Sequence, residues 1–496
     1  MTETTGFEVA VVGAGIGGLA VACLVARTGR SVLLLERAAD AGGVCRPLVP
    51  GGREGLHFDL GATFLSGLQP AQSVGMLCQR LGLELATTPC EPPFQVALPR
   101  HRISLFSAPQ ACTREIRREC PADEAAWATL WADLDTLEAE RNRLLQVMPP
   151  LPPRGWRDRL RVWRLSAGRG RAGPRGELLR QAMGTSFHEA LERHGFSLIS
   201  QRILEACLWF LALRSPEECS ALEAMLALQP LRRGAMRVAG GAGALVEALA
   251  ARFERDGGRL RLGTAVEHLL VERGSVRGVV TAEHEAIRAR AVVAAVPPTA
   301  LTPGLLPEGR GLLRRGATLP SPWQGTVGAQ TLAVAVPGAV VPSALSGHCF
   351  VIRHSDQPAR DENLFIVRVS PPADGAGDAL RMVTVSRFLR VQAHAADDES
   401  GADLFDALEE LIPGAREQAA FQQVLGPAAL AEHWGRPAAA VRYAPESHDW
   451  LGRRGVAHEV GWPGLFVVGD WTYPGRLVAD VVEGAMEVAD TIIGAS

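Results

Sequence analysis

A glycine-rich segment near the N-terminus has the residue types and spacing of a dinucleotide-binding turn. Residues 9–12 are apolar, the sequence GAGIGG places Gly13, Gly15 and Gly18 next, and residues 19–26 are again apolar. Gly13 permits a tight turn, Gly15 lets the backbone approach a pyrophosphate, and Gly18 lets a helix pack close to the strand. The amides that open such a helix point at phosphate. The pattern therefore predicts a strand, a turn and a helix that bind a dinucleotide.

A carboxylate stands where a ribose contact is expected. Gly29 ends the predicted helix, residues 31–35 form a second buried strand, and Glu36 follows. It lies about 20 residues beyond the turn, the usual position for an acid that accepts both ribose hydroxyls. A glycine loop alone is weak evidence, and a lone Glu at a strand end is often only solvated. The complete set in register favours a dinucleotide site.

Three further segments determine which dinucleotide is expected. Residues 41–46 read AGGVCR, residues 58–63 read FDLGAT, and residues 464–470 read GLFVVGD before a loop and a helix from about Ala479. They resemble segments of flavoproteins in the amine oxidase and phytoene desaturase superfamily. The resemblance implies FAD, with Asp470 at its ribityl or pyrophosphate region. It also implies that the following helix points its N-terminus at the flavin pyrimidine.

The middle of the chain resembles the central piece of the same flavin domain. Residues 236–250 and 258–298 match it, and the resemblance gives the strand around Val266 backbone contacts with adenine. Residues 240–243 read GGAG, which we interpret as the start of a helix and not as a second nucleotide loop. The motifs and the resemblance together give these cofactor-binding residues: Gly13, Ala14, Gly15, Ile16, Gly17, Gly18, Glu36, Arg37, Gly43, Arg46, Gly61, Ala62, Val266, Gly469, Asp470 and Val478.

The order of these motifs resembles the phytoene desaturase and carotene isomerase family, particularly its bacterial carotenoid desaturases. The likeness adds the sequence VPP after the return strand and VVGDWTYPG near the C-terminus. It implies removal of hydride from an allylic bond of a long apolar polyene to flavin N5, or a flavin-assisted isomerisation without net redox change. Residues 476–480, RLVAD, depart from the small, glycine-rich residues more typical of this family.

The elements that position these motifs predict an α/β fold with a discontinuous Rossmann-type FAD-binding domain. We assign residues 1–88, 233–300 and 425–496 to that domain. Residues 89–232 and 301–424 then form an α+β substrate-binding domain with a helical cap. Short apolar runs predict strands at 331–336, 349–353, 363–369 and 381–388, and helical periodicity appears at 123–145, 200–213 and 402–411.

The cap carries a strongly basic strip at residues 154–180. It holds nine arginines against only Asp158 and Glu177, and Trp156 and Trp163 are interleaved. Such a strip suits an anionic membrane surface, and it equally suits a solvated loop in an arginine-rich protein. A nucleic acid is the least favoured partner for this strip, and we expect none, because no nucleic-acid-binding fold accompanies it. The arginines are Arg154, Arg157, Arg159, Arg161, Arg164, Arg169, Arg171, Arg175 and Arg180.

Composition narrows the function classes. The net charge is −3 and all 51 basic residues are arginine, so no side chain can form a Schiff base. A flavin amine oxidase that acts on a small amine remains an alternative, although this chain offers no lysine to hold water near N5. A non-catalytic isoprenoid-binding escort on the same fold is another. The nine scattered cysteines indicate reduced thiols in a cytoplasmic protein and no metal site. The basic strip adds a peripheral location on the inner face of the membrane as an alternative.

The sequence does not identify catalytic residues. His188, His433 and Asp449 are titratable and suit acid-base roles, although a lone histidine is more often structural. Trp471 and Tyr473, just after Asp470, face either the isoalloxazine ring or ordinary core. The expected substrate is an apolar small molecule, and its identity, the electron acceptor and the oligomeric state stay open.

Overall fold

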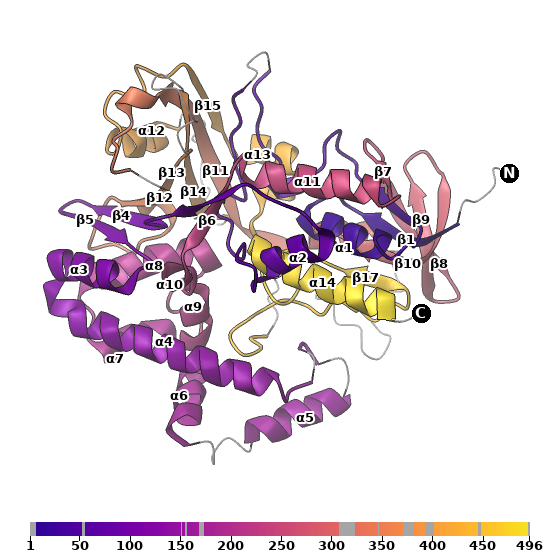
Figure 1. The fold of residues 1–496 in the computed structure, drawn as a ribbon, viewed down its shortest axis with the longest axis horizontal. Helices are drawn as coiled ribbons and strands as arrows, with labels where there is room; N and C mark the ends of the chain where they lie inside the picture. The colour runs from indigo at the N-terminus through magenta and orange to yellow at the C-terminus, as the bar shows by residue number, and fades with distance from the viewer. Residues whose placement is uncertain are drawn as a thin grey trace.

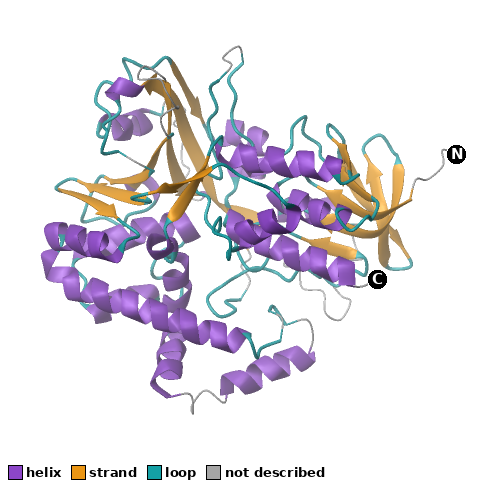
Figure 2. Cartoon of the chain, viewed as in Figure 1, coloured by secondary structure: helices purple, strands orange, loops and turns teal. Residues whose placement is uncertain are grey.

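Two sheets, each covered by helices, form the two lobes of the molecule (Figures 1 and 2). The computed structural model describes residues 6–51, 55–149, 151–153, 156–167, 173–306, 323–345, 347–370, 380–391, 401–444 and 448–494. Both termini of this described part lie in the lobe that carries the glycine-rich turn (Figure 1). The α/β fold class expected from the sequence is confirmed.

The first sheet has seven strands in the order β7-β2-β1-β10-β9-β8, with β17 paired to β10. Pairing is parallel from β7 through β2 and β1 to β10 and on to β17, and antiparallel among β10, β9 and β8. The strands are β1 (Gly6–Val12), β2 (Val32–Leu35), β7 (Arg259–Arg261), β8 (Val266–Glu272), β9 (Ser275–Thr281), β10 (Ala286–Ala294) and β17 (Leu465–Val467).

This sheet is buried on both faces at its centre because residues 9–12 of β1 and all of β2 are apolar. Val9 and Val11 of β1 pack against helices, whereas Ala10 and Val12 pack into the core on the opposite face. Alternation along the strand sends neighbouring side chains to opposite faces, and a parallel strand must cover both. The helices on the first face are α1 (Ile16–Ala26), α2 (Ser73–Leu81), α11 (Gly241–Arg255) and α14 (Val478–Gly494), which lie together in Figure 1.

The second sheet has eight strands and forms the back of the other lobe. Its order is β15-β11-β14-β13-β12-β4-β5, and β16 pairs with β11. The helix α12 (Ala402–Glu409) covers one face through Leu404, Phe405 and Leu408. The strands are β4 (Phe94–Leu98), β5 (His101–Leu105), β11 (Gln324–Pro337), β12 (His348–Ile352), β13 (Leu364–Val369), β14 (Leu380–Arg390), β15 (Phe421–Leu425) and β16 (Arg442–Ala444).

A layer of helices lies below this sheet in Figure 1 and corresponds to the predicted cap. Its core is aromatic, with Trp127, Phe187 and Trp209 at most 1% exposed. The helices are α3 (Pro109–Glu119), α4 (Glu124–Leu145), α6 (Gly173–Gly184), α7 (Phe187–His194), α8 (Leu198–Ala212), α9 (Ala221–Ala227) and α10 (Pro230–Arg233). Among the described residues, no helix is long and apolar enough to cross a membrane.

The structure also places the basic strip of the cap. Residues 156–167 form α5 (Trp156–Ala167), which projects from the helical layer at the lower right of Figure 1, and Arg175 and Arg180 lie on α6. Arg154, Arg169 and Arg171 fall outside the described residues. Trp156 and Trp163 are 71% and 64% exposed.

The predicted strands and helices of the second lobe are confirmed, with bounds within three residues except that β11 begins seven residues before the predicted strand. One further detail lies near residue 240. A short strand, β6 (Ala235–Val238), precedes the GGAG segment, but it is buried only at its two ends and pairs with β3 (Thr87–Cys90) in a separate two-stranded sheet. Gly240 has φ 79° and caps α11, as expected of a helix start.

The division into domains stays a prediction. All strands of the first sheet lie within residues 1–88, 233–300 and 425–496. From the last of these segments, however, β16 pairs with β11 in the second sheet, and α13 (Pro427–Trp434) packs against the same strand. Two elements near residue 440 that we assigned to the FAD-binding domain, β16 and α13, therefore pack in the second lobe.

Candidate functional site

A cavity of about 720 Å³ opens at the carboxyl ends of β1 and β2. This volume lies within the range of small-molecule and cofactor sites, and the strand ends of an open parallel sheet are where such sites form. The lining extends from Glu36 and Val266 past the glycine turn to Asp470 and Val478. One elongated cavity therefore joins segments from the two ends of the chain.

The glycine turn has the geometry that its sequence predicts. Gly13 has φ 100°, and a Cβ there would lie 2.4 Å from the Ala295 carbonyl oxygen. A Cβ on Gly18 would lie 2.0 Å from the Gly13 carbonyl oxygen, so the helix packs directly on the turn. A Cβ on Gly15, in contrast, would meet no protein atom within 4 Å. Gly15 thus faces open space in the cavity, at the N-terminus of α1.

Glu36 is held by two backbone amides. Its Oε2 accepts from Ala14 N at 2.7 Å, and its Oε1 accepts from Ala38 N at 2.9 Å. These bonds fix the carboxylate at the end of β2, where it lines the cavity. Ala14 is itself buried and does not line the cavity, and it acts on the site through its amide, which holds Glu36.

Helix α13 closes the side of the cavity across from the turn. Arg37 donates to the Gly435 carbonyl at 2.5 Å, and Arg46 donates to the His433 carbonyl. The Arg46 Nε and the Trp434 Nε1 are buried, and neither has a hydrogen-bond partner within the described residues. Both residues line the cavity. Neither nitrogen atom reaches the cavity surface, so the two residues line the cavity through their other atoms.

The other end of the cavity is built around an ion pair. Asp470 follows β17 and the glycine Gly469, and its Oδ2 lies 2.5 Å from Arg436 Nη1. The nearby Asp470 raises the pKa of the Arg436 guanidinium, against the effect of burial. Val478, the first residue of α14, lines the same end of the cavity. The positive end of that helix dipole is therefore directed at whatever occupies the site.

The structure brings together nearly all residues that the sequence indicated. Ala14 and Gly18 lie behind the cavity wall, in the turn and its helix. The others line the cavity directly: Gly13, Gly15, Ile16, Gly17, Glu36, Arg37, Gly43, Arg46, Gly61, Ala62, Val266, Gly469, Asp470 and Val478.

A second cavity of about 940 Å³ adjoins the first. Asp470, Arg476, Leu477 and Val441 line both cavities, so the two meet beside the loop that follows β17. The lining continues along Trp323, Trp471 and Tyr473 and reaches Leu145, Met148 and Leu151 at the end of α4. Apolar and charged side chains alternate along it.

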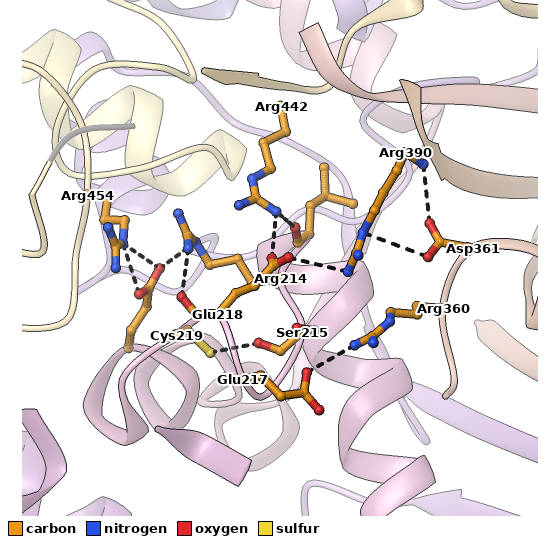
Figure 3. A network of polar contacts seen from close by, with 12 residues as sticks. Arg214, Ser215, Glu217, Glu218, Cys219, Arg360, Asp361, Arg390, Arg442 and Arg454 are labelled. Carbon is orange, nitrogen blue, oxygen red and sulfur yellow. Dashed lines mark hydrogen bonds and ion pairs between the residues drawn. The ribbon is translucent and has the colours of Figure 1, made fainter. Parts of the chain in front are cut away.

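A network of arginines and carboxylates forms one wall of the second cavity (Figure 3). Glu223, only 8% exposed, lies 2.9 Å from Arg214 Nε and 3.0 Å from Arg454 Nε. Glu218 accepts from Arg442 Nη1 at 3.0 Å and lies 3.3 Å from Arg390 Nη2. Burial raises the pKa of Glu223, and the two guanidinium groups oppose that shift. Each of these arginines is matched by a carboxylate, and through them Arg442 and Arg454 join the cap to the C-terminal segment.

The titratable residues singled out in the sequence lie in different places. His188 lines neither cavity and lies 3.5 Å from Glu192 on α7. Asp449 accepts from Ser220 Oγ at 2.8 Å and from Gly452 N at 2.6 Å, contacts typical of a structural turn. His433 lines the first cavity, burial lowers its pKa, and its Nε2 contacts the Arg46 carbonyl at 3.1 Å.

The two aromatic residues after Asp470 line the second cavity. Trp471 donates from Nε1 to the Val296 carbonyl at 3.0 Å and packs edge-on against Trp323. Tyr473 is buried beside Arg141. Both aromatic residues therefore lie where the cavities meet.

Sequence reasoning missed Arg436 and Arg141 and gave Arg476 no role. Arg436 and Arg141 belong to no motif, and their partners are more than thirty residues away along the chain. Arg476 was noticed only as a departure from the resembling family. Among the described residues, no cluster of histidine, cysteine, aspartate or glutamate could hold a metal ion.

Comparison with known proteins gives a consistent result. The model of a family described as flavin containing amine oxidoreductase matches residues 16–493. A phytoene desaturase (neurosporene-forming) of Cereibacter sphaeroides is 26% identical over 519 aligned residues, covering 96% of this chain and 93% of the relative. A zeta-carotene-forming phytoene desaturase of Myxococcus xanthus is 28% identical over 303 residues, covering 59% and 53% of the two chains.

A solved structure supports the fold. Cyclohexylamine oxidase from Brevibacterium oxydans superposes with a TM-score of 0.65 at 17% identity, covering 99% of each chain. At this identity the similarity concerns the fold alone.

Proposed function

Because this chain belongs to the flavin-containing amine oxidoreductase family, we propose that it dehydrogenates a long apolar polyene that lies in the second cavity. It is an FAD-dependent oxidoreductase of the phytoene desaturase-like branch of that superfamily. The observation that carries the polyene proposal is the junction of the two cavities at Val441 and Leu477. A substrate in the second cavity reaches the first one there.

We propose that FAD lies along the first cavity. Gly15 leaves room for the pyrophosphate beside the N-terminus of α1, and Glu36 is fixed where it accepts ribose hydroxyls. The cationic side chain of Arg46, which lines the cavity, suits a phosphate, and Asp470, anchored by Arg436, suits the ribityl hydroxyls. Bound FAD supplies a two-electron acceptor.

The residues around the junction exclude water and orient the substrate. Trp323, Trp471 and Tyr443 present aromatic surface there, and Tyr443 is 7% exposed. Val441 and Leu477 add aliphatic surface at the junction, beside the charged Asp470 and Arg476. Such a lining positions an apolar chain by packing, and dehydrogenation of an activated allylic bond then depends mainly on orientation.

The likeness to carotenoid desaturases favours a polyene over an amine. The Cereibacter sphaeroides phytoene desaturase matches the sequence of this chain over nearly its full length, whereas the likeness to cyclohexylamine oxidase concerns the fold. The chain also has no lysine to hold water beside the flavin. Isomerisation would use the same placement and differs in leaving no net oxidised product.

We further propose that α5 docks on an anionic membrane surface, which places the protein on the inner face of the membrane. Trp156, Leu160 and Trp163 are 71%, 37% and 64% exposed and share one helical face at spacings of four and three residues. Arg157, Arg159 and Arg164 flank that face. On the opposite side, Val162 packs beside Leu145 and Met148, which line the second cavity. Substrate from a bilayer would therefore enter beside α5.

The test is product formation from a polyene in liposomes. Purified FAD-loaded protein is incubated with phytoene in anionic liposomes and an electron acceptor, and the extract is separated and its absorption spectrum recorded. We expect products with additional conjugated double bonds. An unchanged double-bond count with altered geometry would indicate isomerisation, and turnover of amines alone would contradict the proposal.

A further inference from the structure

The second cavity contains more cationic groups than its proposed apolar substrate requires. Seven arginines line it: Arg141, Arg214, Arg233, Arg442, Arg453, Arg454 and Arg476. Five have a carboxylate partner. Arg214 and Arg454 share Glu223, Arg442 pairs with Glu218, Arg453 lies 2.8 Å from Glu483, and Arg233 contacts Glu138. Among the described residues, Arg141 and Arg476 have no carboxylate within ion-pair distance.

Arg476 lies at the junction and lines both cavities. Its Nη1 donates to the Phe210 carbonyl at 3.2 Å and to the Leu211 carbonyl at 2.8 Å. These two bonds hold the guanidinium against α8 and leave Nε and Nη2 to the cavity. Burial lowers the pKa of Arg476 to about 10, and the group therefore remains a cation at neutral pH. A buried cation without an anion is costly, so an anionic ligand would be strongly favoured beside it.

The carboxylates nearest to Arg476 are occupied elsewhere. Asp470 is bound to Arg436 at 2.5 Å. Asp480 accepts from the Leu477 amide at 3.2 Å, and burial raises its pKa, which weakens it as a counter-ion. Neither completes an ion pair with Arg476 within the part of the chain that the structure describes.

Arg141 adds a second cation near the same loop. It is 6% exposed, its Nε donates to the Leu451 carbonyl at 2.9 Å, and a hydrogen bond joins it to Tyr473. Burial lowers the pKa of this guanidinium too. Arg141 therefore contacts the loop after β17 that also carries Arg476, and both arginines line the second cavity.

We propose that the substrate of this cavity carries an anionic group, a carboxylate or a phosphate, bound by Arg476 with Arg141 as a second contact. The inference rests on the proposed function and names its substrate class, an apolar chain with one charged end. Since Arg476 lines both cavities, the charged end lies beside the cofactor cavity. The apolar chain extends toward Leu145, Met148 and Leu151.

The test compares probes that differ only in their head group. Retinoic acid, methyl retinoate, retinol and retinyl phosphate are bound to the FAD-loaded protein, and their affinities are measured by equilibrium dialysis. We expect the acid or the phosphate to bind about tenfold or more tightly than the ester and the alcohol, because a charged hydrogen bond contributes most when desolvated. The stronger of the two anions identifies the head group.

The variants locate the effect. Arg476→Gln should abolish most of the preference for the anion, Arg476→Lys should retain part of it, and Arg141→Gln should reduce it. Arg454→Gln is the matched control, because Arg454 lines the same cavity but is paired with Glu223. Its preference should stay near that of the unmodified protein.

Equal affinity for acid and ester in the unmodified protein would overturn the inference, and that comparison needs no variant to fold. An Arg476→Gln protein that keeps the preference but binds FAD more weakly would also overturn it, since Arg476 would then serve the cofactor. If the acid binds through Arg476 but no polyene reduces the flavin, the proposed function fails and this inference stands. If phytoene reduces the flavin and no anion is preferred, the proposed function stands and this inference fails.

Discussion

At the scale of single residues, the site combines residues that could be predicted from sequence motifs with residues that could not. Glu36 could be predicted because its distance from the glycine turn is set by one strand and one helix. Arg436 could not, because its pairing with Asp470 depends on α13 folding back from the other lobe. Local motifs encode contacts within one βαβ unit, whereas tertiary contacts such as this pair leave no spacing signature.

Glu36→Gln should weaken FAD binding by roughly 10- to 100-fold. The carboxylate that accepts both Ala14 and Ala38 amides becomes an amide, which accepts with one oxygen only and has no charge. Fluorescence titration of the apoprotein with FAD measures the loss. The matched control is Glu267→Gln, which removes a carboxylate lining the same cavity but exposed. Equal losses in both variants would contradict a specific role for Glu36.

The Asp470–Arg436 pair should behave as one unit. Asp470→Asn or Arg436→Gln alone leaves one buried group unpaired and should lower the midpoint of thermal unfolding by several degrees. The double variant should unfold at a midpoint no lower than that of the less stable single variant, because the second substitution removes the group that the first one left unpaired. Differential scanning calorimetry measures all three. Additive losses would show that the two side chains act independently.

Buried His348 predicts a specific pH dependence of stability. Burial lowers its pKa to about 3 from an ordinary 6.5, and Thr63 Oγ1 contacts its Nε2 at 3.2 Å. Between these values the unfolded chain binds one more proton than the folded one, so stability rises with pH up to about 6.5. The thermal midpoint should therefore fall between pH 6.5 and 4, and less steeply in His348→Gln. Identical slopes in the two proteins would refute this assignment.

At the scale of elements, most strands and helices could be predicted from the sequence, and the second cavity could not. Apolar runs and periodicity located β12 to β14, α4 and α8 within three residues, whereas β11 begins seven residues earlier than its apolar run predicted. The cavity is assembled from the end of α4, the loop before β17 and the loop after it. No pattern within any one of these segments indicates that they converge, so only the fold reveals Arg141 and Arg476 as neighbours of one loop.

The helix α5 predicts binding to anionic membranes. Trp156→Ser with Trp163→Ser should lower the fraction of protein that sediments with anionic vesicles by roughly tenfold, because the exposed indoles lose their apolar contact. Binding should also weaken as salt is raised, since the flanking arginines are screened. Leu262→Ser is the control, an exposed apolar residue, 41% accessible, outside the helix. Unchanged sedimentation of the tryptophan variant would exclude α5 as the docking element.

At the scale of the whole molecule, one cofactor connects segments from both ends of the chain. The first cavity is lined by the N-terminal turn, by β8, by α13 and by the start of α14. A ligand that contacts all of them stabilises the folded state by a free energy that grows with the logarithm of its concentration relative to the dissociation constant. The overall architecture followed from motifs at opposite termini, whereas the exchange of β16 and α13 between lobes did not.

Selective stabilisation by FAD follows from this arrangement. Added FAD should raise the thermal midpoint of the apoprotein, and NAD⁺ at the same concentration should not, because the GGAG segment begins α11 and builds no second dinucleotide turn. Thermal shift measurements with both nucleotides decide the matter. An equal increase with NAD⁺ would mean that the site does not discriminate between the two dinucleotides.

The most direct test of the central claim is anaerobic reduction of the bound flavin by a polyene. FAD-loaded protein is mixed without oxygen with liposomes that contain phytoene, and the flavin absorbance band near 450 nm is followed, with empty liposomes and a panel of amines in parallel. Our account predicts that the band bleaches with phytoene and persists with empty liposomes and amines. Bleaching by amines alone, with the phytoene sample unchanged, would contradict it.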